Sequence, residues 1–388
     1  MISCAESFGT TTFIKNFCEM NLSYWELKNW FTNIDYTIVG SGIVGLHAAL
    51  RLREKFPQSK ILILEKGPLP QGASTKNAGF ACFGSLSEIV SDLQCHSTND
   101  VVQLIKKRWH GLQLLRNRLG DKVIDFQQNG GYELFEKSDS AFDKCMSQLA
   151  EVNTMLRPLF NKDVFERCEN SFGFANVRND MIHNPFEAQI DTGNMMQALL
   201  KVAIANDIMI LNMQKVASYN ETSNGVQVFM QDFDFRTKKL LFATNGFARE
   251  LTNNAVVPAR AQVLVTKPIK DLKLKGTFHL DEGFYYFRNI GDRILLGGGR
   301  NLDIAGETTE EFGQTDAIQN RLDQLLKEVI LPNTEFEVDH RWSGIMGMGA
   351  HKSPIVKQLS NHVYCGVRLG GMGVAIGSIV GTELAELI

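Results

Sequence analysis

Residues 35–50 read Asp-Tyr-Thr-Ile-Val-Gly-Ser-Gly-Ile-Val-Gly-Leu-His-Ala-Ala-Leu, and this stretch decides the fold. Its first residues are mostly β-branched, aromatic or apolar, which indicates a strand, and the residues after Gly45 indicate a buried helix. Between the two, Gly40, Gly42 and Gly45 match the G-x-G-x-x-G pattern of dinucleotide-binding turns. The first glycine of that pattern allows a tight turn, the second lets the backbone approach a pyrophosphate, and the third lets helix and strand pack closely.

A second strand with an acidic end supports the same interpretation. Residues 60–65 read Lys-Ile-Leu-Ile-Leu-Glu, and Glu65 lies 20 residues after Gly45, where an acid accepts hydrogen bonds from a ribose diol. A pyrophosphate is expected at the N-terminus of the intervening helix, where free N–H groups and the helix dipole favour negative charge. The alternative is a glycine-rich turn before a buried helix, with no ligand.

Composition excludes several other classes of protein. The chain has 388 residues, more than one simple core accommodates, so two domains are expected. Its 40 basic and 43 acidic residues give a net charge of -3, which gives no reason to expect nucleic acid or an anionic membrane as a partner. The seven cysteines form no C-x-x-C pair, so we expect no disulfide framework and no metal site. No apolar run is long enough to span a membrane, and we expect a cytoplasmic protein.

Two segments near the N-terminus carry further expectations. The aromatic residues 23–30 are expected to pack on the body of the protein, and Met20 is a possible natural start. Residues 66–80 form a long loop, rich in glycine and proline, that contains the small residues Gly-Ala-Ser-Thr at 72–75. These small residues suit close contact with a flat cofactor, although a plain surface excursion is the alternative.

The rest of the chain alternates helices and strands and then changes character. Apolar spacing predicts helices over residues 101–119, 140–156, 194–205 and 315–329, and strands over 132–135, 208–212, 226–229, 239–246, 263–266, 284–288 and 293–297. The strands after residue 256, separated by turn signals, suggest a second sheet that is antiparallel.

The order of the motifs resembles the D-amino-acid oxidase superfamily of FAD-dependent oxidoreductases, which includes glycine oxidase, sarcosine oxidase and γ-glutamylputrescine oxidase. The resemblance rests on the glycine turn, Glu65, and the motifs at 72–79, 243–246, 258–262, 286–288, 296–298, 342–344 and 370–373. It implies an α/β, Rossmann-like, discontinuous FAD-binding domain and an α+β substrate domain with an antiparallel sheet and helices. The implied division is an extension at 1–34 packing on the FAD domain, an FAD domain at 35–85, 184–257 and 336–388, and a substrate domain at 86–183 and 258–335.

The resemblance also implies which residues hold FAD. They are expected to surround the pyrophosphate, the adenosine and the flavin. The expected set is Gly40, Gly42, Ile43, Val44, Gly45, Glu65, Lys66, Ser74, Thr75, Lys76, Asn77, Ala78, Val216, Thr244, Asn245, Gly246, Gly370, Gly371, Met372, Gly373 and Val374. The family's flavin-linking Cys and His positions are not matched here, so non-covalent FAD is expected.

The implied reaction is hydride transfer from an amine-bearing carbon to flavin N5, giving an imine that water hydrolyses. Glycine oxidase places a carboxylate-binding Arg where this chain has Met346, which puts a simple α-amino acid in doubt. Arg288, Arg300 and Tyr286 are the other candidates for the pocket, with Arg288 slightly ahead; interdomain salt bridges are the alternative for both arginines. Tyr285 and Tyr286 alternate along one strand, so at most one faces the pocket.

The resulting prediction is an FAD-dependent oxidoreductase that acts on a small amine or amino-acid derivative. Two alternatives stay open: an FAD-dependent 2-hydroxy acid dehydrogenase, and a catalytically silent flavin-binding protein. The sequence leaves the oligomeric state undetermined.

Overall fold

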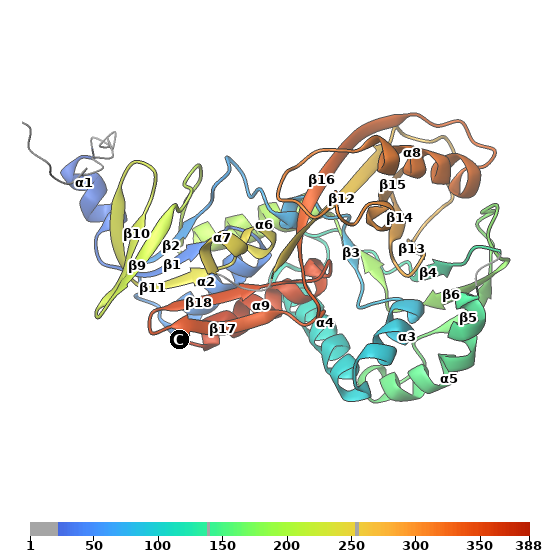
Figure 1. Ribbon diagram of the computed structural model, residues 1–388, viewed down its shortest axis with the longest axis horizontal. Coiled ribbons are helices and arrows are strands. Elements are labelled where there is room, and N and C mark those ends of the chain that lie inside the picture. Colours follow the sequence, from blue (N-terminus) through green and yellow to red (C-terminus); the bar gives the residue numbers. More distant parts are fainter. Residues whose placement is uncertain (1–21, 138–139, 253–255) are drawn as a thin grey trace, which may run out of the picture.

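The computed structural model describes residues 22–137, 140–252 and 256–388, and Figure 1 shows a molecule with a sheet towards each end. The possible start at Met20 lies outside the described residues. The described chain begins with α1 (Tyr24–Glu26) and a π-helical turn, η1 (Leu27–Phe31). Tyr24 and Trp25 are 66% and 64% exposed, so the aromatic segment does not pack on the body as expected. Phe31 makes the contact instead, against Phe233 at 4.6 Å between ring centroids.

The first sheet is a Rossmann-like layer whose central strands are parallel. Its order is β17-β18-β11-β1-β2-β8, and the antiparallel hairpin β9-β10 attaches to β11. The strands are β1 (Ile34–Val39), β2 (Ile61–Leu64), β8 (Met209–Leu211), β9 (Ser218–Thr222), β10 (Gly225–Phe229), β11 (Asp234–Phe242), β17 (Ile355–Ser360) and β18 (Val363–Val367). Helices α2 (Ile43–Lys55), α6 (Thr192–Ala205) and α9 (Gly373–Glu386) contribute to its main apolar core, as does part of α4 (Thr98–Leu119).

The second sheet has the order β16-β12-β15-β14-β13-β4-β6-β5. It is antiparallel except for the parallel pair β13–β4. The strands are β4 (Gly131–Leu134), β5 (Glu166–Glu169), β6 (Asp180–Asn184), β12 (Val257–Thr266), β13 (Thr277–Leu280), β14 (Tyr285–Ile290), β15 (Arg293–Gly298) and β16 (Val338–Met348). Helix α8 (Asp316–Leu325) continues into the π turn η5 (Leu326–Ile330), and both pack on one face. The other face looks towards the first sheet.

Shorter elements and three further helices connect the two sheets. Helices α3 (Leu86–Cys95), α4 (Thr98–Leu119) and α5 (Ala141–Phe160) lie at the lower edge of the view in Figure 1. The small pair β3 (Phe80–Ala81) and β7 (Ala188–Gln189) lies between the sheets. The remaining short turns are η2 (Ala73–Thr75), η3 (Asn245–Phe247), α7 (Arg249–Thr252) and η4 (Arg300–Leu302). Across the described chain, every helix is too short or too polar to cross a lipid bilayer.

Two elements belong to a different sheet or core than the domain division expected from the sequence. Strand β16 lies within 336–388, yet it pairs with β12 from Val257↔Met348 onward, in the second sheet. Helix α4 lies within 86–183, yet Leu112, Leu115 and Leu119 join the core of the first sheet. In both cases the position of the element depends on a partner far away in the sequence. Strand β16 pairs with the free side of β12, and α4 packs against α9.

Candidate functional site

A cavity of about 740 Å³ lies between the two sheets. Its lining comes from the ends of β1 and β2, the loop after β2, the starts of α2 and α9, and the inner face of the second sheet. This volume falls in the range of ligand sites, roughly 300–1,000 Å³. The cavity therefore joins the predicted cofactor residues and the predicted substrate residues in one space.

The glycine turn brings backbone close to backbone at the start of α2. Gly40 has φ of +104°, and a side-chain carbon there would lie 2.8 Å from the carbonyl oxygen of Ala243. A side-chain carbon at Gly45 would lie 1.9 Å from the carbonyl oxygen of Gly40, so this glycine permits the close packing of helix and strand. Gly42 is the N-cap of α2 and supplies no side-chain hydrogen bond. Gly40 and Gly42 line the cavity, whereas Gly45 lies behind them.

Glu65, at the end of β2, is 5% exposed and lines the cavity. Its Oε2 accepts hydrogen bonds from the backbone N–H of Ser41 at 3.1 Å and from the Ser41 hydroxyl at 2.8 Å. Its Oε1 accepts the N–H of Gly67 at 3.1 Å. These donors fix a buried carboxylate whose remaining lone pairs can accept hydroxyl groups from a ligand.

The loop after β2 lies over the cavity, as its small residues suggested. Ser74 receives the N–H of Ile43, the first residue of α2, at 3.0 Å through its hydroxyl oxygen. A side-chain carbon at Gly42 would lie 2.8 Å from that same oxygen. Thr75 is not in the lining and donates its hydroxyl to Pro70 O at 2.7 Å. On the other side of the loop, the indole N–H of Trp342 in β16 donates to the carbonyl oxygen of Lys76 at 2.9 Å.

Most of the other expected cofactor residues also line the cavity. The hydroxyl of Thr244 is buried and has no hydrogen-bond partner in the described part of the chain. Gly246 lies behind the lining, where a side-chain carbon would be 2.7 Å from Met346 O. Helix α9 starts after Met372 without a side-chain cap, so its first N–H groups are available at the cavity. The expected cofactor residues that the cavity contacts are Gly40, Gly42, Ile43, Val44, Glu65, Lys66, Ser74, Lys76, Asn77, Ala78, Val216, Thr244, Asn245, Gly370, Gly371, Met372, Gly373 and Val374.

This arrangement fits FAD. The N-termini of α2 and α9 can receive a pyrophosphate and a negatively charged ring edge, because their first N–H groups have no partner within the helix. In α2 the N–H of Ile43 is already accepted by Ser74. A buried carboxylate at the end of β2 matches a ribose, and the free hydroxyl of Thr244 has a ligand position in front of it.

Arg288 does not reach the cavity, although the sequence placed it first among the substrate candidates. Its guanidinium donates to the carbonyl oxygens of Ala78, Ile190 at 3.0 Å and Asn289 at 3.1 Å. The residue is 5% exposed, and burial lowers its pKa to about 10. Arg288 therefore connects β14 to the loops that precede β3 and α6, and its role is structural.

The other three substrate candidates, Tyr286, Arg300 and Met346, do line the cavity. Tyr286 faces it, whereas Tyr285 packs in the core on the opposite face of the sheet, so only one of the pair faces the pocket, as expected. Burial raises the pKa of Tyr286 to about 12, which keeps its phenol protonated. Gly297 on the adjacent strand makes room for the ring, since a side-chain carbon there would lie 2.6 Å from it.

Arg300 lies just after β15 and lines the cavity on the side of the second sheet, where it has few partners. Its guanidinium makes no hydrogen bond and no ion pair within 4 Å to any described residue. Burial lowers its pKa, and the charge of Glu307 opposes that change. Glu307 itself is already engaged by Arg260 at 2.8 Å and Gln262 at 3.0 Å.

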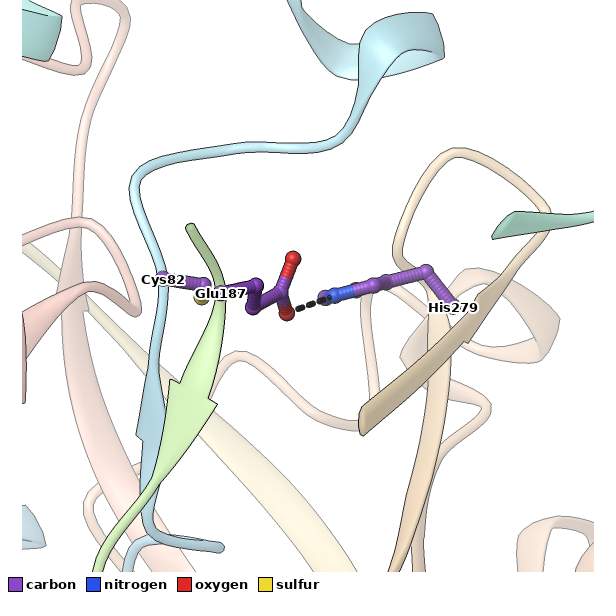
Figure 2. Close-up of side chains that lie close together, drawn as sticks. All are labelled: Cys82, Glu187 and His279. Atoms are coloured by element: carbon purple, nitrogen blue, oxygen red, sulfur yellow. Dashed lines mark hydrogen bonds and ion pairs between the residues drawn. The ribbon is translucent and has the colours of Figure 1, made fainter. Parts of the chain in front are cut away.

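Sequence reasoning missed a polar group on the inner wall: His279 of β13, with Glu187 and Cys82 beside it. Figure 2 shows the Glu187 carboxylate hydrogen-bonded to the His279 ring, with Cys82 on a neighbouring segment. His279 and Cys82 line the cavity. Side chains alternate along a strand, so residues 277–280 place His279 on the face of the sheet away from Phe278. No local signal connects His279 to a glutamate 92 residues away.

A model of the family described as FAD dependent oxidoreductase matches residues 35–387. The chain belongs to this family. Its curated relative, the probable oxidoreductase OrdL of Haemophilus influenzae, is 20% identical over 372 residues, which cover 91% of this chain and 82% of that protein.

Solved structures share the fold at low identity. Glycine oxidase from Geobacillus kaustophilus has a TM-score of 0.73 at 18% identity and covers 91% of this chain and 94% of its own. L-proline dehydrogenase from P. horikoshii has a TM-score of 0.72 at 16% identity, with 92% and 93% covered. The predicted family and the predicted FAD cofactor are thereby confirmed, and the chain is an FAD-dependent oxidoreductase.

Proposed function

We propose that this FAD-dependent oxidoreductase oxidises the C–N bond of a small amine or amino-acid derivative. The observation that carries the proposal is that one cavity joins the FAD-binding turn to a wall with Arg300 and Tyr286. The guanidinium of Arg300 has no hydrogen bond to any described residue, and the phenol of Tyr286 stays protonated. Both groups donate hydrogen bonds, and a carboxylate of the substrate supplies the matching acceptor. The relatives named for glycine and L-proline are consistent with such a substrate.

FAD, when bound, supplies a hydride acceptor at N5. The chain's own residues position the substrate and exclude water, because the apolar side chains of Phe80, Met346 and Met372 line the same space. The N–H groups at the start of α9 favour negative charge in the cavity. This chemistry needs a positioned, neutral amine more than an acid–base pair.

We propose that the cofactor is held without a covalent bond. Cys82 is a nucleophile in the cavity wall, but burial raises the pKa of its thiol well above the usual value, so it stays protonated. His279 is engaged by Glu187. A flavin that moves into the supernatant after acid precipitation is the expected result, and yellow colour kept in the pellet would contradict it.

Anaerobic reduction of the purified holoenzyme tests the reaction. Amines and amino acids should bleach the flavin absorbance, more slowly when the carbon bearing nitrogen is deuterated. In Arg300→Gln the KM for carboxylate-bearing amines should rise about tenfold or more, as expected for loss of a charge-assisted hydrogen bond. Arg293→Gln is the matched control, because Arg293 begins β15, the strand that precedes Arg300, and pairs with Asp339 outside the cavity. Reduction by 2-hydroxy acids and not by amines would overturn the proposal.

A further inference from the structure

His279 stands in a row of residues that crosses the inner wall from strand to strand. The register pairs Glu133 with His279, His279 with Tyr286, and Tyr286 with Gly297. Paired residues of neighbouring strands lie on the same face, so His279 and Tyr286 present adjacent side chains to the cavity. The ring of Phe80 makes edge contacts with both, at 5.3 Å and 5.6 Å between centroids.

Glu187 holds the imidazole of His279 by a hydrogen bond from the side away from the cavity. This carboxylate is 1% exposed, accepts the hydrogen bond from His279 Nε2, and accepts a second from the hydroxyl of Thr277 at 3.0 Å. Figure 2 shows Glu187 and His279 pointing at one another from two separate segments. The other ring nitrogen, Nδ1, makes no hydrogen bond to any described residue.

Cys82, Glu187 and His279 also offer three potential metal-ligand atoms within 4.8 Å of one another. Nε2 of His279 and Oε1 of Glu187 are already joined by a direct hydrogen bond. The buried Cys82 thiol is held protonated by the shift of its pKa. An ion pair therefore accounts for the grouping without a metal.

The imidazole is held in its charged form. Burial alone lowers the pKa of His279, but the charge and hydrogen bond of Glu187, with the charges of Glu88 and Glu133, raise it to about 9. At neutral pH both ring nitrogens are donors, and Nε2 is taken by Glu187. The remaining donor, Nδ1–H, needs an acceptor that no described residue provides.

We propose that His279 is a second anion-binding position, so that the substrate is an amine carrying two carboxylate groups, one at Arg300 and one at His279. This inference rests on the proposed function and names its substrate class. The Nδ1–H of His279 and the guanidinium of Arg300 have no acceptor among the described residues, and leaving such donors desolvated is costly unless a ligand supplies the acceptors. Glu187 is then a positioning residue, since it holds the charge and the ring orientation without touching the ligand.

Binding of unreactive acids to the holoenzyme tests the inference apart from turnover. Malonate, succinate and glutarate, and the monocarboxylates acetate, propionate and butyrate, are titrated while the visible spectrum of the bound flavin is followed. At least one dicarboxylate should bind about tenfold or more tightly than its monocarboxylate counterpart, as expected for one additional charge-assisted hydrogen bond. Equal affinity across each matched pair would overturn the inference, even if amines reduce the flavin. A clear dicarboxylate preference with no amine oxidation would instead overturn the proposed function alone.

Three variants assign the preference to this position. His279→Asn and Glu187→Gln should remove the dicarboxylate preference and change monocarboxylate binding less than about threefold. His183→Asn is the matched control, because His183 of β6 lies in the same sheet, outside the cavity, and pairs with Glu166 of β5 at 2.8 Å. In the unaltered protein the preference should fade as the pH rises through about 9, and in Glu187→Gln it should already be absent at pH 7. A preference that survives in a folded, flavin-bound His279→Asn, or that is independent of pH, contradicts the assignment.

Discussion

Two buried threonines allow the cofactor site to be distinguished from the general core by single substitutions. Thr37 and Thr244 each bury a hydroxyl without a hydrogen-bond partner among the described residues, but only Thr244 lines the cavity. Thr244→Val should weaken FAD binding by about tenfold, because a hydroxyl with no protein partner is available to the ligand. Thr37→Val should leave the FAD dissociation constant unchanged. Fluorescence titration of each apoprotein with FAD makes the comparison, and equal affinities for the two variants would contradict the placement of FAD against Thr244.

Substitutions of Arg288 and Arg300 should give opposite results. Arg288→Lys removes a planar group that reaches three carbonyl oxygens, so the free energy of unfolding should fall by about 2–4 kcal/mol. Its KM should change little once the protein is folded. Arg300→Gln should do the reverse, since its guanidinium has no hydrogen bond to lose. Urea unfolding and steady-state kinetics on both variants decide this, and a KM effect confined to Arg288→Lys would restore the original ranking from sequence.

At the scale of elements, α9 packs closely against α2 through a glycine. A side-chain carbon at Gly381 would lie 2.4 Å from the carbonyl oxygen of Val44 and 2.7 Å from the β-carbon of His47. Gly381→Ala should therefore lower the free energy of unfolding by about 1–3 kcal/mol or more, because backbone atoms must move. Gly193→Ala in α6 is the control. There the nearest contact is the Asp191 carboxylate oxygen at 3.2 Å and no backbone atom lies close, so the change should be below about 1 kcal/mol. Thermal unfolding of both variants measures the difference.

Across the whole molecule, the features that were predicted correctly from the sequence are those that depend on neighbouring residues in the chain. The turn at Gly40 and the strand that leads to Glu65 were predicted because each depends on residues adjacent in the chain. The sheet membership of β16, the packing of α4 and the fixed role of Arg288 were not, because each depends on partners far away in the sequence. The predicted cofactor residues mostly line one cavity, whereas the wall carrying His279 exists only once the second sheet has formed.

Two buried histidines should give the stability of the whole apoprotein a maximum near pH 6.5. His279 has its pKa raised from 6.5 to about 9, chiefly by Glu187 acting against burial, so the folded state holds a proton that the unfolded state loses. Its contribution is complete below pH 6.5 and is lost as the pH rises towards 9. His47 has its pKa lowered to about 3 by burial and by the charge of Arg118, so its contribution is complete above pH 6.5 and is lost as the pH falls.

Each histidine contributes a slope of up to about 1.4 kcal/mol per pH unit on its own side of the maximum. Urea unfolding of the apoprotein between pH 5 and pH 9 should therefore show stability declining in both directions. His279→Asn should flatten the alkaline side and His47→Gln the acid side, because each removes one titrating group. An alkaline decline that persists in His279→Asn would mean that the imidazole of β13 is not held charged by the fold, and the second anion position would lose its physical basis with it.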